Sequence, residues 1–105
     1  MELVIRQTCI DPDLIQVLKN EAAGRNIFLQ DLYEESFLDF LESRSVCVDD
    51  VVYLASPRDG KELNIKIRPS LFARLDEVAR KDRVSLRRLL FTALFTYANM
   101  LEAEK

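Results

Sequence analysis

The segment Ser85-Leu86-Arg87-Arg88 has the groups with which the start of a helix can hold an anion. Ser85 is a favourable N-cap residue, and apolar residues at helical spacing follow it directly. The free backbone N–H groups and the dipole at a helix start favour phosphate. Arg87 and Arg88 oppose that dipole, so helix stability does not explain them, whereas phosphate binding does. The alternative is that both arginines only solvate the helix surface.

A second set of polar residues alternates with apolar ones in residues 62–68. The apolar members are Leu63, Ile65 and Ile67, and the polar members are Glu62, Asn64, Lys66 and Arg68. A period of two is typical of a half-buried strand. The solvent side of this strand would present a carboxylate, an amide and two cations, which together offer both hydrogen-bond donors and acceptors.

Two helices are expected after this strand. Pro69 ends the strand and fits the first turn of a helix. The apolar spacing predicts a short helix over residues 70–81 and a longer one from Leu86 to Leu101. A unit of this size is too small to enclose a core of its own and needs a second unit to pack against.

The first part of the chain repeats this pattern at a shift of 57 positions. Pro12 then falls on Pro69, and the apolar positions of both helices and the turn keep one register without a gap. We therefore infer an internal duplication, with a strand in residues 1–10 and helices over 13–23 and 27–42. Asp11 or Asp13 would cap the first helix, and residues 24–26 would form the turn.

The first strand fits the repeat less well than the helices do. In the gapless register, Arg6 and Thr8 take the positions of Leu63 and Ile65, which would bury an arginine. A bulge of one residue would instead turn Leu3 and Ile5 inward and leave Val4 and Arg6 outward. The outward residues of this strand would then be Arg6 and either Gln7 or Thr8.

The resulting organisation is a first unit at 1–44, a connection at 45–60 and a second unit at 61–105, with one shared core. The connection is too apolar for a flexible linker, so we expect part of it to pack on that core. The composition of residues 56–60 predicts a turn before the second strand. The predicted fold is α+β and mostly α, with a two-stranded antiparallel ribbon and four helices.

Charge is divided unevenly between the two parts of the chain. The net charge of −3 combines four basic and eleven acidic residues in 1–57 with eleven basic and seven acidic residues in 58–105. Such a division can mark an anion-binding part and a solvated part. The chain has no histidine, and Cys9 and Cys47 do not form a metal-ligand spacing, so we expect no metal or cofactor. No signal peptide or membrane span is expected, and a cytoplasmic location follows.

A strand, a proline-led helix and a second helix capped by serine, all within about 45 residues, resemble the ribbon-helix-helix (Arc/MetJ-type) DNA-binding family. The likeness runs from Leu63-Asn64-Ile65-Lys66-Ile67 through Ser85 to Leu101, and the first unit matches mainly in its helices. Because both units lie in one chain, the resemblance implies a tandem pseudo-dimer that is monomeric in isolation. Tandem proteins of this kind occur among accessory factors of conjugative plasmid transfer, and a transcriptional repressor is the other expectation.

In that family the two-stranded ribbon enters the major groove of double-stranded DNA, and its outward side chains read base edges. By resemblance, the base-reading residues would be Glu62, Asn64, Lys66, Arg6 and Thr8. The phosphate-binding residues would be Arg68, Ser85, Leu86, Arg87 and Arg88. The residue types suit these roles, since Asn can bond adenine bidentately, Lys can reach guanine acceptors and Glu can accept from cytosine.

Other classes of function have less support in the sequence. Catalysis is not expected: Glu34 and Glu35 could hold a metal but are assigned to a solvated helix face, and the acidic residues near Lys66 lack the E-x-K spacing of a nuclease site. Phe91 and Phe95 lie one turn apart on the last helix and either complete the core or form a patch for a protein partner, including self-association on DNA. The alternative function is an interaction module, such as an antitoxin or assembly adaptor, with weak or no DNA binding. The acidic first part favours that alternative.

Overall fold

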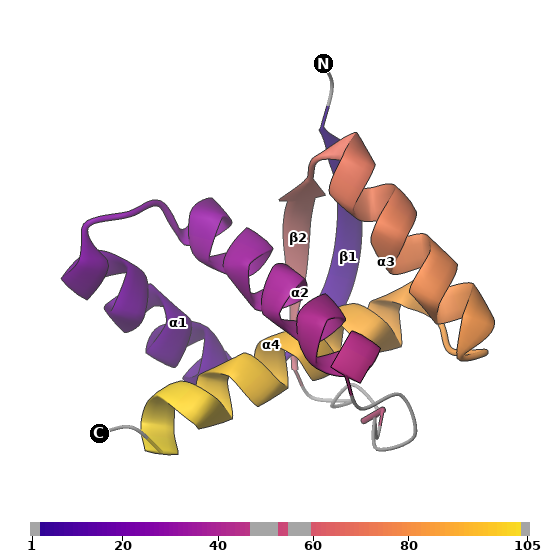
Figure 1. Cartoon of the computed structure of the whole chain (residues 1–105). Helices are drawn as coiled ribbons and strands as arrows, with labels where there is room; N and C mark the ends of the chain where they lie inside the picture. The colour runs from indigo at the N-terminus through magenta and orange to yellow at the C-terminus, as the bar shows by residue number, and fades with distance from the viewer. Residues whose placement is uncertain (1–2, 47–52, 55–59, 104–105) are drawn as a thin grey trace.

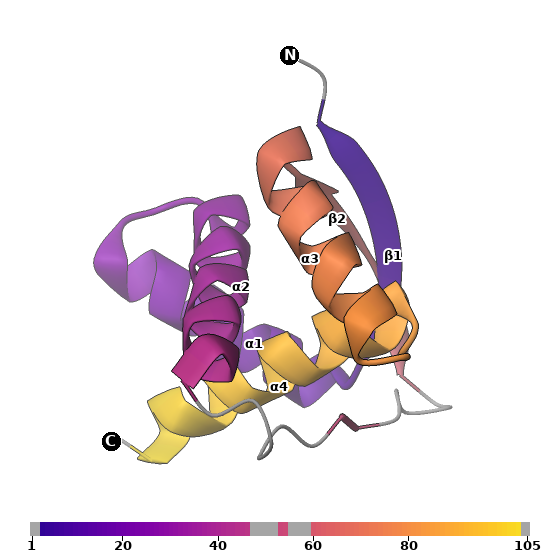
Figure 2. The same cartoon turned by 45° about the vertical axis from the view of Figure 1, so that its right-hand side comes forward.

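Four helices and one pair of strands make up the described part of the chain. The computed structural model describes residues 3–46, 53–54 and 60–103. The elements are β1 (Val4–Ile10), α1 (Pro12–Arg25), α2 (Leu29–Val46), β2 (Lys61–Ile67), α3 (Pro69–Lys81) and α4 (Leu86–Ala103). The strands form a two-stranded sheet at one edge of the molecule, with the helices on one side of it (Figures 1 and 2). The predicted α+β, mostly helical class is confirmed.

The two strands pair antiparallel in an unbroken register. Gln7 lies opposite Asn64 at the centre, and the end pairs are Val4 with Ile67 and Ile10 with Lys61. The bulge predicted for the first strand is therefore wrong, and the gapless register holds. Arg6 does fall in the row that faces the helices, but it remains exposed. Its long side chain carries the guanidinium to the Phe72 ring on α3, where the charge stays accessible to solvent.

Both turns between helices have the same geometry. Asn26 and Arg83 adopt the left-handed conformation, with φ of 56° and 57°. In each turn the amide of the next residue donates to the carbonyl oxygen five residues earlier, at 3.0 Å. This bond satisfies a carbonyl group at the end of the preceding helix. The first helix also begins as expected, because the Asp11 carboxylate accepts a hydrogen bond from the Asp13 amide at 3.0 Å.

The buried apolar side chains of both parts of the chain form one cluster. Helix α4 packs against β1, α2 packs against β2, and the two long helices contact each other. Each long helix thus lies on the strand from the other part of the chain. The predicted core residues that are buried are Leu18, Leu32, Phe37, Leu71, Leu75, Leu89 and Leu94, while Leu14 is partly buried against the cluster.

The described residues of the connection, Tyr53 and Leu54, also contact the core. The Leu54 amide donates to Thr92 Oγ1 at 3.0 Å, and the Tyr53 ring lies 5.9 Å from that of Phe40. The Tyr53 hydroxyl donates to the Asp82 carboxylate. Cys47 and the rest of the turn expected before Gly60 lie outside the described residues.

An ion pair links the end of α2 to the end of α3. The Arg44 guanidinium donates to both oxygens of Asp82, at 2.6 and 2.8 Å. These bonds, assisted by that from Tyr53, lower the pKa of Asp82 from 3.8 to about 2. A carboxylate whose pKa is lower in the folded state stabilises the fold above its unfolded pKa. Its contribution is lost as the pH falls from about 4 toward 2.

The variant Asp82→Asn should therefore have a flatter dependence of unfolding free energy on pH between 4 and 2. The expected difference is about 1 kcal/mol, since the pair is partly open to solvent and is screened. Urea denaturation at a series of pH values measures it. Asp39→Asn, on the exposed side of α2, is the matched control. An unchanged pH profile in Asp82→Asn would contradict the assignment.

Candidate nucleic-acid interface

The side of the ribbon that faces away from the helices presents three cross-strand pairs. Residues directly opposite in an antiparallel pair point to the same face. The pairs on the outer face are Ile5 with Lys66, Gln7 with Asn64, and Cys9 with Glu62. All of these residues except Cys9 are exposed. Glu62, Asn64 and Lys66 therefore lie together on one open face, as the alternation in the sequence predicted.

Two amide side chains form the centre of this outer face. Gln7 and Asn64 are the only directly opposed amide pair in the described ladder. Each amide has two N–H donors and a carbonyl acceptor, the combination that matches the N6 and N7 positions of adenine. Beside them, Ile5 can contact a thymine methyl and Lys66 a guanine acceptor. The row is chemically able to read base edges in a major groove.

Two residues predicted to point outward do not. Thr8 is fully buried, and its hydroxyl donates to the Arg87 carbonyl oxygen at 2.9 Å. Arg6 lies in the inner row, where its guanidinium sits 4.7 Å from the centroid of the Phe72 ring. The gapless register is the reason for both corrections. Gln7, the alternative that the sequence left open, occupies the outward position between them.

The N-terminus of α4 lies beside β1, held there by the Thr8–Arg87 hydrogen bond. Ser85 caps this helix, because its Oγ accepts from the Arg88 amide at 3.2 Å. Arg87 and Arg88 are exposed and Leu86 is half-buried. Arg87 also lies 3.7 Å from a Glu62 oxygen, a loose contact of little energetic weight for exposed groups. This flank of the ribbon therefore presents two cations at a helix start, as predicted.

The N-terminus of α2 lies on the other flank and differs in chemistry. The Gln30 side-chain amide donates to the Lys66 carbonyl oxygen, which ties α2 to β2. Phe28, just before the helix, is 80% exposed, and the acidic Asp31 is exposed in the first turn. An exposed carboxylate at this position repels a phosphate group. The two flanks of the ribbon are thus a basic one and an apolar, acidic one.

Arg68, a predicted phosphate contact, is engaged within the chain. Its Nε lies 3.0 Å from a Glu34 oxygen, and the two side chains are 56% and 18% exposed. The pair joins the end of β2 to α2. Because Glu34 offsets its charge, Arg68 offers less to a phosphate than Arg87 or Arg88 does. The sequence did not indicate this pairing, since Glu34 was assigned to a solvated helix face.

The predicted aromatic patch on α4 is largely part of the core. Phe91 is 5% exposed, and Phe95 is partly buried against the same cluster. Their ring centroids lie 5.7 Å apart. Of the two interpretations of these rings, the structure therefore favours core packing over a surface for a partner. The exposed apolar side chains lie elsewhere and include Leu3, Ile5 and Phe28.

Several functional candidates on this surface had weak or no signals in the sequence. Gln7 could be assigned only by choosing the register, which depended on accepting Arg6 in the inner row. Ile5 looks like a core residue in an apolar strand, and it is 56% exposed. The exposure of Phe28 could have been predicted from the repeat, because a shift of 57 positions aligns it with Ser85, the exposed helix cap.

No metal site or membrane helix is found within the described ranges. No group of three or more His, Cys, Asp or Glu residues there could hold a metal ion, and none of the helices is long and apolar enough to cross a membrane. Comparisons with protein-family models, with curated proteins and with solved structures find no match for this chain. The geometry of the ribbon and its flanks is therefore what indicates a function.

Proposed function

We propose that this chain is a double-stranded DNA-binding protein that inserts its two-stranded ribbon into the major groove. A groove of B-DNA about 12 Å wide admits such a ribbon. The observation that supports this function best is the open outer face with Gln7 and Asn64 opposed at its centre. Arg87 and Arg88 at the start of α4 would bind phosphate beside the groove.

The same proposal includes a tandem ribbon-helix-helix pseudo-dimer within one chain. Several features recur at the shift of 57 positions: the helix-starting prolines, the left-handed residues Asn26 and Arg83, and the hydrogen bond that closes each turn. The strand pairing agrees with the same shift, because Gln7 pairs with Asn64, the residue 57 positions later. This is the relation expected of two copies paired about a twofold axis.

Salt-dependent binding to random duplex tests the proposal. Each phosphate contact by a cation releases counterions and adds about one unit to the slope of log affinity against log salt. The variant Arg87→Ala should weaken all sequences alike and reduce this slope by about one unit. Fluorescence anisotropy at several salt concentrations measures both effects.

Lys19→Ala, which removes an exposed cation on α1, is the matched control and should leave the slope unchanged. Equal losses in Arg87→Ala and Lys19→Ala would contradict a defined phosphate contact at α4. Wild-type protein that fails to bind duplex at low salt would refute DNA binding itself. Circular dichroism of each variant shows whether the fold is retained.

A protein-interaction module is the second candidate function. It is favoured by the exposed apolar side chains Leu3, Ile5 and Phe28, which are 44%, 56% and 80% exposed. The net charge of −3 also acts against non-specific attraction to phosphate. In this case the chain would not bind duplex DNA even at low salt. Phe28→Ser would abolish association with the protein partner, and Arg87→Ala would leave that association intact.

A further inference from the structure

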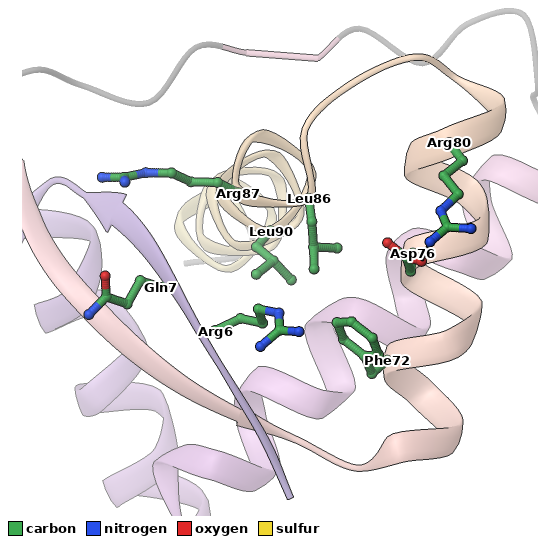
Figure 3. A pocket seen from close by; sticks show the side chains of 8 residues that line it. All are labelled: Arg6, Gln7, Phe72, Asp76, Arg80, Leu86, Arg87 and Leu90. Atoms are coloured by element: carbon green, nitrogen blue, oxygen red, sulfur yellow. Dashed lines mark ion pairs between the residues drawn. The ribbon is translucent and has the colours of Figure 1, made fainter.

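A cavity of about 500 Å³ lies between β1, α3 and the first turn of α4. Its lining residues are Arg6, Gln7, Phe72, Asp76, Arg80, Leu86, Arg87 and Leu90. Figure 3 shows the Arg6 side chain directed toward the Phe72 ring, with Leu86 and Leu90 above them and the Asp76–Arg80 pair on the far wall. The volume is in the range of small-molecule sites.

Arg6 is the unusual member of this lining. It occupies an inner-row position of the ribbon, where its cross-strand partner Ile65 is fully buried. Residues that break a local pattern often mark functional sites. The corresponding inner-row position in the other strand, 57 residues later, is the apolar Leu63.

Within the described residues, the charge of Arg6 is also the least compensated of the three arginines in the cavity. Arg80 lies 3.0 Å from an Asp76 oxygen, and Arg87 lies 3.7 Å from Glu62. Among the described residues, Arg6 forms no ion pair with a carboxylate. Its guanidinium contacts the Phe72 ring and donates to the Ile5 carbonyl oxygen at 2.9 Å. A guanidinium has five N–H donors, so several remain to hold a planar anion.

The apolar residues of the lining indicate which kind of ligand would fit the cavity. Phe72 and Leu86, both partly buried, supply an aromatic ring and an aliphatic side chain next to the guanidinium, whereas Leu90 is fully buried. Such side chains favour contact with a flat apolar group. With three arginines and one aspartate, the lining has a formal excess of positive charge. A ligand that satisfies both features has an aromatic body and one carboxylate.

We propose that this cavity binds a small aromatic carboxylate, with the carboxylate on Arg6 and the ring against Phe72 and Leu86. The inference does not depend on DNA binding, because the ligand binds the free chain. Gln7 and Arg87 contribute to both the cavity and the ribbon surface described above. The bound anion would therefore lie beside residues proposed to contact DNA.

The test is a titration of the isotope-labelled full chain, without DNA, followed by NMR. The probe is phenylacetate. Two comparison compounds separate its features: neutral phenylacetamide keeps the ring without the charge, and inorganic phosphate keeps a negative charge without the ring. We expect saturable shifts at Arg6, Phe72 and Leu86 with phenylacetate. Each of the other two probes should bind at least about tenfold more weakly, because each lacks one of the two contacts.

Arg6→Gln should lower the affinity for phenylacetate by about tenfold or more, which corresponds to the loss of one charge-assisted contact. Arg74→Gln, an exposed arginine of α3 outside the cavity, should leave it unchanged. Phe72→Leu provides a second variant that removes the ring and keeps an apolar side chain. Absence of saturable shifts, shifts that map elsewhere, or equal affinities in Arg6→Gln and Arg74→Gln would overturn the proposal.

Discussion

Replacing Leu32 or Leu89 by alanine is expected to lower the free energy of unfolding by about 2–5 kcal/mol. Both side chains are fully buried, Leu32 on α2 and Leu89 on α4. Removal of a buried leucine loses its transfer free energy and leaves a cavity that neighbours fill only in part. For a chain of this length such a loss is a large fraction of the total stability.

The same substitutions test how the two parts of the chain depend on each other. Because α2 lies on β2 and α4 lies on β1, either substitution should destabilise the whole molecule in one transition. Urea denaturation followed by circular dichroism and by tyrosine fluorescence measures this. Leu38→Ala, at a 40% exposed leucine of α2, is the matched control and should cost little. Two separate transitions, or stable folding of either part alone, would contradict the shared core.

Prediction from the sequence succeeded where the periodicity was strong. The alternation in residues 62–68 placed Glu62, Asn64 and Lys66 on one open face, and the helical spacing identified the four helices. Both signals are local, because each depends on which side of an element meets the core. Boundaries were less accurate, since α2 extends to Val46 rather than to residue 42.

Prediction from the sequence was wrong for polar side chains whose positions depend on contacts with distant elements. Arg6 was placed outward because a buried charge is costly, yet it lies in the inner row with its guanidinium exposed and in contact with the Phe72 ring. Thr8 was placed outward because it is polar, whereas its hydroxyl finds the Arg87 carbonyl oxygen inside. The pairing of Arg68 with Glu34 depends on tertiary contacts. None of these three arrangements has a periodic signature in the sequence.

On the proposed DNA-binding function, Asn64→Ala and Gln7→Ala should each cost about 1–3 kcal/mol on the preferred duplex, at neighbouring base positions. The reason is that each amide can form two hydrogen bonds with an adenine edge, and alanine forms none. Selection from random duplexes identifies the preferred site, and anisotropy titrations of single-base variants assign each loss to a position. Asn99→Ala, an exposed amide of α4, should have no effect.

On the same proposal, the two ends of the ribbon would give the preferred DNA site a direction. At one end Ile5 lies opposite Lys66, and at the other Cys9 lies opposite Glu62. The first end suits a thymine methyl and guanine acceptors, whereas the second suits a cytosine amino group. The central amides would accept a symmetric core, but the flanking bases should differ, so one molecule would bind a non-palindromic site in one orientation.

Alanine substitutions at the two ends of the ribbon distinguish a single-chain ribbon from a homodimeric one. Lys66→Ala should relax base preference on one side of the site only, and Glu62→Ala on the other side only. A homodimeric ribbon presents each residue twice around a twofold axis, so each substitution would change both sides alike. A perfect inverted repeat bound by two molecules would therefore contradict the single-chain ribbon, and measurement of stoichiometry on the selected site decides between the two.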